Sequence, residues 1–125
     1  MKIRIKGDSL RLRLTQSEVA QLAKEGKVQS SVGFTPLKAL VYGLEIAGQA
    51  SEVSARFEEN VITVSVPQGL AKEWTETDLV GFDAQQPIEE GRTLSILIEK
   101  DFHCLVPRAG ENESDQYPNP LAKAQ

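Results

Sequence analysis

Two segments of this chain, 52 residues apart, carry the same succession of hydrophobic patterns. The first begins at Gly7 and reads GDSLRLRLTQSEVAQLAKEGKV, and the second begins at Glu59 and reads ENVITVSVPQGLAKEWTETDLV. Each passes from the period of two that is typical of a strand to helical spacing, and then back to a strand. Chance alternation can imitate one hairpin, but hardly this ordered change of period. The pattern therefore predicts an internal duplication.

The first unit, residues 1–50, opens with a predicted β-hairpin. The segment KIRIKGDSLRLRL alternates apolar and basic residues on either side of Gly7-Asp8, which predicts two strands with one face in water. Thr15 and Glu18 have the spacing of a capping box, and Gly26 stands where a left-handed C-cap is needed. A short helix between these signals, followed by two further strands, completes a ββαββ order.

The second unit, residues 51–105, repeats that order with different polar residues. Pro67 is predicted to open its helix, and Trp74 falls on the counterpart of Leu22, which indicates a core residue. The offset of 52 also pairs Val28 with Val80. A slip of two residues, assigned to a predicted loop with the sequence QQPIEEGRT, then aligns the last strands.

Neither unit has enough apolar surface to fold alone, because a few strands with one short helix leave their hydrophobic face in water. We therefore predict an α+β, mainly β fold, in which two ββαββ repeats form a small antiparallel pseudo-twofold barrel or sandwich with two short helices. Residues 1–105 are predicted to form this single domain. Residues 106–125 are a polar, proline-containing C-terminal tail, either mobile or anchored to the domain by Tyr117.

The stretch ITVSVPQGLAKEWTETDLVGFDA resembles the half-barrel unit of AbrB/MazE-like swapped-hairpin proteins, and GDSLRLRLTQSEVAQL is similar to the same element with Thr15 in place of the proline. In that family two copies from two chains interlock into a barrel. The resemblance implies an internal pseudo-dimer here. It departs from the family where a Gly-Asp pair is usual before the third strand, because this chain has Glu25-Gly26 and Thr77-Asp78.

The two halves of the chain differ in the sign of their charge. Residues 1–50 carry a net charge of +4 and residues 51–125 a net charge of −8. The basic residues of the first hairpin share its wet face or its turn: Lys2, Arg4, Lys6, Arg11 and Arg13. Such a stripe is often only solvation and protection of a sheet edge, or a counterpart of the acidic half. The main functional hypothesis is that it binds a partner, either a protein or a small anion.

DNA binding, which the AbrB/MazE resemblance implies, is disfavoured by charge. Arg11 and Arg13 correspond to Thr63 and Ser65 in the second unit, and Lys6 corresponds to Glu58. A sequence pI near 5.0 also contrasts with the basic domains that neutralise several phosphates at once. An AbrB-like nucleic-acid-binding regulator therefore remains one alternative, and an enzyme or metal site near His103 and Cys104 is the other.

Possible chemistry is limited to the segment EKDFHC and the residues after it. His103 and Cys104 are adjacent, so in a strand they point to opposite faces and do not form a nucleophile and base pair by themselves. No metal-ligand spacing is present, and we predict no cofactor and no metal. The motif EKDFHC with a downstream YPNP also resembles a family of small uncharacterised bacterial proteins, which implies no function.

A single cysteine, an N-terminus without an apolar leader and the lack of a long apolar run predict a soluble, cytoplasmic protein that does not enter a membrane. We expect the protein to be a binding module rather than an enzyme, and either a monomer or a weak homo-oligomer.

Overall fold

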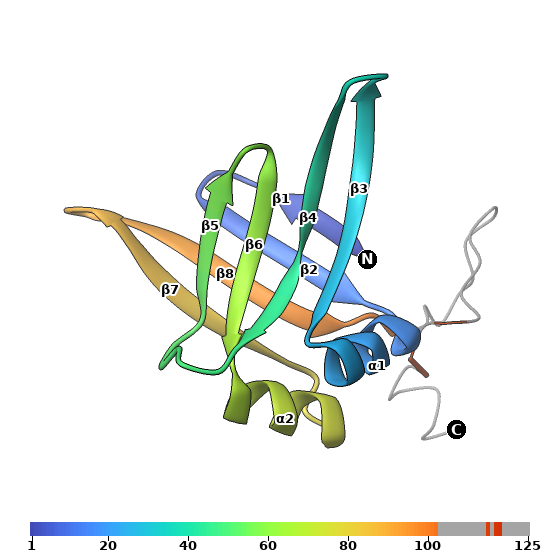
Figure 1. The fold of residues 1–125 in the computed structure, drawn as a ribbon. Coiled ribbons are helices and arrows are strands. Elements are labelled where there is room, and N and C mark those ends of the chain that lie inside the picture. The colour runs from blue at the N-terminus through green and yellow to red at the C-terminus, as the bar shows by residue number, and fades with distance from the viewer. Residues whose placement is uncertain (103–114, 116, 119–125) are drawn as a thin grey trace.

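A computed structural model describes residues 1–102, 115, 117 and 118 (Figure 1). The first half of the described chain contains β1 (Lys2–Ile5), β2 (Ser9–Leu14), α1 (Gln16–Glu25), β3 (Lys27–Thr35) and β4 (Lys38–Ala47). The second half contains β5 (Ser54–Glu58), β6 (Val61–Pro67), α2 (Gln68–Glu76), β7 (Gly81–Glu89) and β8 (Arg92–Lys100). Both halves have the ββαββ order, which confirms the predicted fold class.

The strands form two four-stranded sheets, and each sheet combines strands of both units. Sheet A has the order β1-β2-β8-β7, and sheet B has the order β3-β4-β6-β5. Each sheet thus joins the first hairpin of one unit to the last hairpin of the other. Exchanging the units converts one strand order into the other, so the arrangement is compatible with a duplicated ββαββ unit.

The two sheets make a sandwich rather than a closed barrel (Figure 1). Pairing is antiparallel within each hairpin, as predicted, whereas the central pairs β2–β8 and β4–β6 are parallel. The parallel register places Leu12 beside Ile98 in sheet A and Leu44 beside Val64 in sheet B. All four side chains are fully buried, and they form the centre of the hydrophobic core.

The two helices contact each other and close one end of the sandwich. The capping box of α1 is present, since the Thr15 hydroxyl accepts from the Glu18 amide and the Glu18 carboxylate accepts from the Thr15 amide. Gly26 has the predicted left-handed C-cap conformation, with φ of 77°. Val19 and Leu22 of α1 and Trp74 of α2 are buried, so the assignment of Trp74 to the core is confirmed.

The sequence alignment of the two units is wrong in one place. Gly26 and Val80 have equivalent positions, because their carbonyl groups accept hydrogen bonds from the amides of Ile46 and Lys100 respectively. The offset therefore reaches 54 before β7 begins, and Val28 corresponds to Phe82 rather than to Val80. The two extra residues lie in the connection between α2 and β7.

The segment predicted as a loop, QQPIEEGRT, is in fact the end of one long hairpin. Strand β7 continues to Glu89 and β8 begins at Arg92, with a register shift between Pro87 and Glu89. Proline is compatible with a strand at an edge or beside a bulge, where no ladder hydrogen bond is lost. β7 is an edge strand, so both conditions are met here. No helix among the described residues has the length and hydrophobicity needed to cross a membrane.

Candidate functional site

Four of the five predicted basic residues surround one shallow hollow on the outer face of sheet A. The hollow measures about 340 Å³ and is lined by Lys2, Ile3, Arg4, Arg11 and Arg13. Lys2 lies opposite Arg13 and Arg4 opposite Arg11 in the β1–β2 ladder, so like charges face each other across the strands. Such pairs are destabilising unless anions lie nearby. Lys6 lies apart, in the turn that follows β1.

Acidic residues of β8 and of the residue after it neutralise part of this charge. The Glu99 carboxylate lies 2.6 Å from Nη2 of Arg11 and 3.4 Å from Nε of Arg13. Lys2 lies 3.3 Å from the buried Asp101 carboxylate. Arg4 takes part in none of the ion pairs found among the described residues. The acidic half of the chain therefore neutralises some of the cations, but one carboxylate serves both Arg11 and Arg13.

The outer face of sheet B is equivalent to that of sheet A but carries fewer basic residues. Arg56 occupies the position equivalent to Arg4, and Glu45 the position equivalent to Glu99. Arg56 contacts the Glu45 carboxylate at 2.9 Å and donates to the Ser65 hydroxyl at 3.1 Å. One arginine and one glutamate therefore suffice there, with Thr63 and Ser65 at the positions of Arg11 and Arg13. The two additional arginines of sheet A have no basic counterpart in sheet B.

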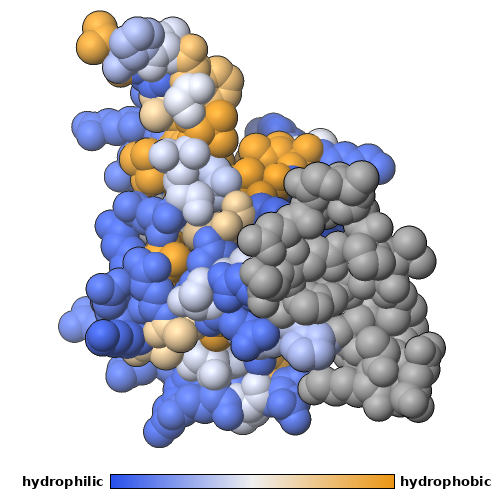
Figure 2. Space-filling model, turned by 90° about the vertical axis from the view of Figure 1, so that its right-hand side faces the viewer, coloured by the Kyte–Doolittle hydropathy of each residue, from blue (hydrophilic) through white to orange (hydrophobic). Residues whose placement is uncertain are grey.

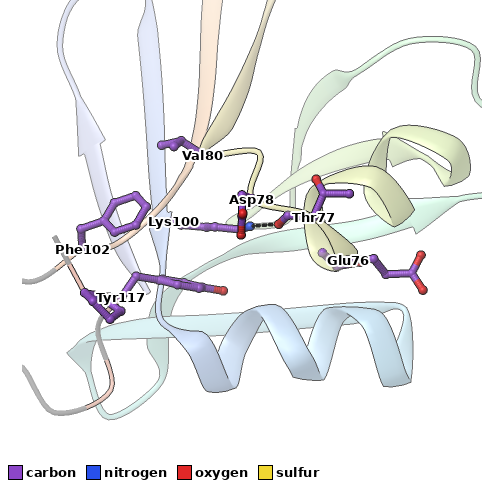
Figure 3. Close-up of a pocket in the computed structure, with 9 residues that line it drawn as sticks. Glu76, Thr77, Asp78, Val80, Lys100, Phe102 and Tyr117 are labelled. Atoms are coloured by element: carbon purple, nitrogen blue, oxygen red, sulfur yellow. Dashed lines mark hydrogen bonds between the residues drawn. The ribbon is translucent and has the colours of Figure 1, made fainter. Parts of the chain in front are cut away.

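A second hollow, of about 400 Å³, lies beside the end of α2 (Figure 3). It is lined by the connection after the helix and by the end of β8, including Thr77, Asp78, Val80, Lys100 and Tyr117. Lys100 points across the hollow, and its Nζ donates to the Thr77 carbonyl at 2.7 Å. The same ammonium group lies 5.5 Å from the centre of the Tyr117 ring.

Two differences between the units produce this hollow. In the first unit Gly26 alone joins α1 to β3, whereas four residues, 77–80, join α2 to β7. In addition, Lys100 pairs with Leu14 in sheet A, and the equivalent pair in sheet B is Ile46 with Val66. A lysine of the second unit therefore occupies the position that an isoleucine has in the first. The extended connection supplies the carbonyl group that the buried ammonium needs.

The local chemistry indicates a structural role for Lys100. Thr77, the C-cap of α2, has an extended conformation, so α2 lacks the glycine cap of α1. A cation at a helix C-terminus satisfies a free carbonyl and interacts favourably with the helix dipole. Burial lowers the pKa of Lys100, and the nearby Asp78 carboxylate opposes that shift.

The tail returns to the domain at the residues that the structure describes. The Tyr117 amide donates to the Asp101 carbonyl at 2.6 Å, and its ring packs against Phe102 with centroids 5.5 Å apart. Burial raises the pKa of the Tyr117 hydroxyl to about 12. The Asp115 carboxylate accepts from the amide and the hydroxyl of Ser17 in the first turn of α1. These contacts agree with the anchoring role predicted for Tyr117.

His103 and Cys104 lie outside the described residues, so their predicted chemistry stays a prediction. Within the described part of the chain, no group of three or more His, Cys, Asp or Glu side chains is arranged to hold a metal ion.

A family model described as a family of unknown function, DUF7009, matches residues 1–121. The chain belongs to this family. No curated protein and no solved structure matches the sequence.

Lys100 of this DUF7009 member is expected to couple stability to alkaline pH. Its folded-state pKa lies below the ordinary value of 10.5, so between these two values the unfolded chain binds the proton more tightly. The free energy of unfolding should therefore rise with pH relative to that of a Lys100→Met variant, by at most about 1.4 kcal/mol per pH unit. Urea denaturation of both proteins between pH 7.5 and 9 measures the difference, in a range where little tyrosine is ionised in the unfolded chain. Parallel pH profiles would contradict the assignment.

Sequence reasoning found the basic face of this DUF7009 protein but missed Lys100. The sequence nevertheless contains a signal for Lys100. The predicted alignment of the last strands pairs Leu44 with Ile98, and two residues further along it pairs Ile46 with Lys100. A charged residue in register with an apolar core position is a useful indication of a site where symmetry between units is broken.

Proposed function

We propose that this chain is a non-enzymatic binding module that recognises an acidic segment of a partner protein through its basic face, defined here as Lys2, Arg4, Arg11 and Arg13. The observation that carries the proposal is the difference between the two units. The equivalent face of sheet B folds with a single arginine at these positions, so the additional cations of sheet A serve something other than folding.

The shape of the basic face favours a protein segment over a small ligand. Small molecules are usually enclosed in deep, largely apolar pockets, whereas this hollow is open and is walled by long cationic side chains. β1 is also an edge strand of sheet A, and one side of its backbone has no strand partner among the described residues. An extended acidic segment alongside β1 would find backbone donors and acceptors as well as arginine groups for its carboxylates.

A duplex nucleic acid fits the charge distribution less well. Affinity for DNA depends on many phosphate contacts, and the second unit presents Glu58 and Glu59 where the first presents Lys6 and Gly7. The exchange of hairpins between units supports an origin by internal duplication, and we infer a distant relation to swapped-hairpin proteins of the AbrB/MazE kind. We do not extend the DNA binding of those proteins to this chain.

The test replaces two arginines with the residues that the second unit carries at the same positions. We expect Arg11→Thr/Arg13→Ser to bind a fluorescein-labelled oligoglutamate peptide about tenfold more weakly than the wild type, since each exposed charge contact contributes up to about 1 kcal/mol. Fluorescence anisotropy at low ionic strength measures the affinity, and an oligoglutamine peptide should not bind. Because Thr63 and Ser65 already occupy this position in the fold, the double variant should remain folded.

Arg56→Ala provides the matched control, since it removes an arginine from the outer face of the other sheet. It should leave peptide affinity unchanged. Equal losses in both variants would indicate unspecific attraction to net charge and would refute the proposal. Binding of a labelled DNA duplex, with a steep salt dependence and loss in the Arg11→Thr/Arg13→Ser variant, would favour the nucleic-acid alternative instead.

A further inference from the structure

The end of the sandwich opposite the helices is open and apolar. A cleft of about 380 Å³ separates the β1–β2 hairpin of sheet A from the β5–β6 hairpin of sheet B. Six apolar residues that line it form three pairs of equivalent positions: Ile5 with Phe57, Leu10 with Ile62, and Leu40 with Leu94. Because equivalent residues meet here, the cleft lies on the pseudo-twofold axis, and the contact between α1 and α2 lies at the other end of that axis.

Two projecting hairpins, β3–β4 and β7–β8, form arms on opposite sides of the open end (Figure 1). Figure 2 shows hydrophobic surface along much of the β3–β4 arm, at the top of the molecule. Phe34 is 70% exposed and Leu37 94% exposed on this arm, and Phe57 is 66% exposed beside the cleft. Ile5, Val32 and Ile88 are also exposed. Monomeric proteins rarely leave such a continuous apolar area in water.

The alternating pattern of the strands continues where the opposite sheet no longer covers them. Val32 lies opposite Leu40 in the β3–β4 ladder, on the same face as the buried pair Val28 and Leu44. Phe57 likewise lies opposite Ile62, on the face that carries the buried Val64. The inner faces therefore keep a core-like composition beyond the core of a single chain.

Charged residues around this open end differ in sign between the units. At or beside the hairpin turns, the first unit carries Lys6, Asp8 and Lys38, and the second unit carries Glu58, Glu59, Glu89, Glu90 and Arg92. Arg92 pairs with both Asp8 and Glu89, which leaves a basic excess in the first unit and an acidic excess in the second. The apolar surface is thus bordered by a basic rim, Lys6 and Lys38, and by an acidic rim, Glu58, Glu59 and Glu90.

We propose that the open end binds a second copy of this chain, end to end, to form a symmetric dimer. Two copies can face each other about a twofold axis perpendicular to the pseudo-twofold axis in two principal ways. One places equivalent rims together, with like charges in contact. The other places the basic rim of each copy on the acidic rim of its partner and covers the apolar cleft of both. The charges select the second, which is self-complementary as an isologous interface must be.

Charge-exchange variants test this pairing without touching the apolar surface. The acidic variant Lys6→Glu/Lys38→Glu and the basic variant Glu58→Lys/Glu59→Lys/Glu90→Lys should each be monomeric, because all their rims then have one sign. An equimolar mixture should restore the dimer as a heterodimer. Native mass spectrometry distinguishes the species by mass, and sedimentation velocity of the full wild-type chain measures its own association.

Truncation of the cleft provides an independent measurement. Phe57→Ala should weaken wild-type dimerisation about 30-fold, which equals roughly 2 kcal/mol for a central aromatic anchor. Circular dichroism should remain unchanged, since this side chain is mostly exposed in the single chain. The Arg11→Thr/Arg13→Ser variant should dimerise normally, because its changes lie on the outer face of sheet A, so failure of the proposed peptide binding leaves this inference intact.

A wild-type chain that stays monomeric at about 1 mM, where an association of even 4 kcal/mol would be visible, would overturn the proposal. Dimerisation with the wild-type affinity in both charge variants, or in Phe57→Ala, would place the interface elsewhere and would overturn the proposal equally.

Discussion

Trp74→Ala is expected to lower the free energy of unfolding by about 3–5 kcal/mol, a large part of the 5–15 kcal/mol typical of a domain of this kind. Trp74 is fully buried where α2 covers the sandwich, and its ring packs edge-on against Phe82 with centroids 5.4 Å apart. Its Nε1 donates to the Val80 carbonyl at 3.1 Å. The alanine variant loses the aromatic contact and leaves a large cavity between the helix and sheet A. Urea denaturation monitored by circular dichroism measures the loss.

Trp74→Phe separates packing from hydrogen bonding. The Val80 carbonyl also accepts from the Lys100 amide at 3.0 Å, so loss of the indole donor does not leave this buried acceptor without a partner. A cost of about 1–2 kcal/mol is therefore expected, combining one hydrogen bond with a smaller ring. If Trp74→Phe were as destabilising as Trp74→Ala, the hydrogen bond rather than packing would dominate at this position.

The parts of the fold that depend on local sequence were predictable. The helix α1 begins and ends at the residues indicated by its capping box and by Gly26, because these signals act within a few residues of the backbone groups they satisfy. The hairpin turns at Gly7 and at Asn60 also have the positive φ angles that their residue types favour. The signals for such features lie within a few residues of the backbone that they fix, so they can be read without knowledge of the tertiary contacts.

The pairing of the central strands could not be predicted from such local signals. β2 and β8 are parallel neighbours although more than 80 residues separate Arg11 from Glu99. Alternation identifies which face of a strand is apolar, but it does not say which strand lies beside it. The ion pairs that partly neutralise the basic face follow from that pairing, so the residues of the face were predictable and their partners were not.

The position of the two-residue insertion, in the connection after α2, could not be predicted for a different reason. Period-two alternation looks the same after a shift of two residues, so the slip between the units was assigned to the polar segment around Pro87. Only the hydrogen bonds from Ile46 to Gly26 and from Lys100 to Val80 place it correctly. The Lys100 hollow is the direct result of this insertion. The misplaced slip in the alignment of the two units and the failure to predict the Lys100 hollow therefore have one cause.

Gly43→Val is expected to destabilise the fold by at least about 3 kcal/mol, which lowers the melting temperature by roughly 10–18 °C for a chain of this size. A Cβ atom at Gly43 would lie 2.2 Å from the Val28 carbonyl oxygen and 2.9 Å from Cγ of Gln29. The nearest of these atoms belongs to the backbone of β3, which cannot move aside without breaking the β3–β4 ladder. Glycine is required here by the close approach of two strands and not by a positive φ angle.

Gly33→Val is the matched control, because Gly33 lies on the paired strand β3 and a Cβ atom there would meet no atom of the described residues within 4 Å. A β-branched residue suits an exposed strand, so stability should change by less than about 0.5 kcal/mol. Both variants are to be compared at the same low protein concentration, since Gly33 belongs to the projecting arm and dimerisation raises apparent stability. Equal melting temperatures for the two variants would mean that β4 adapts to a side chain at position 43 and that the strand contact there is not rigid.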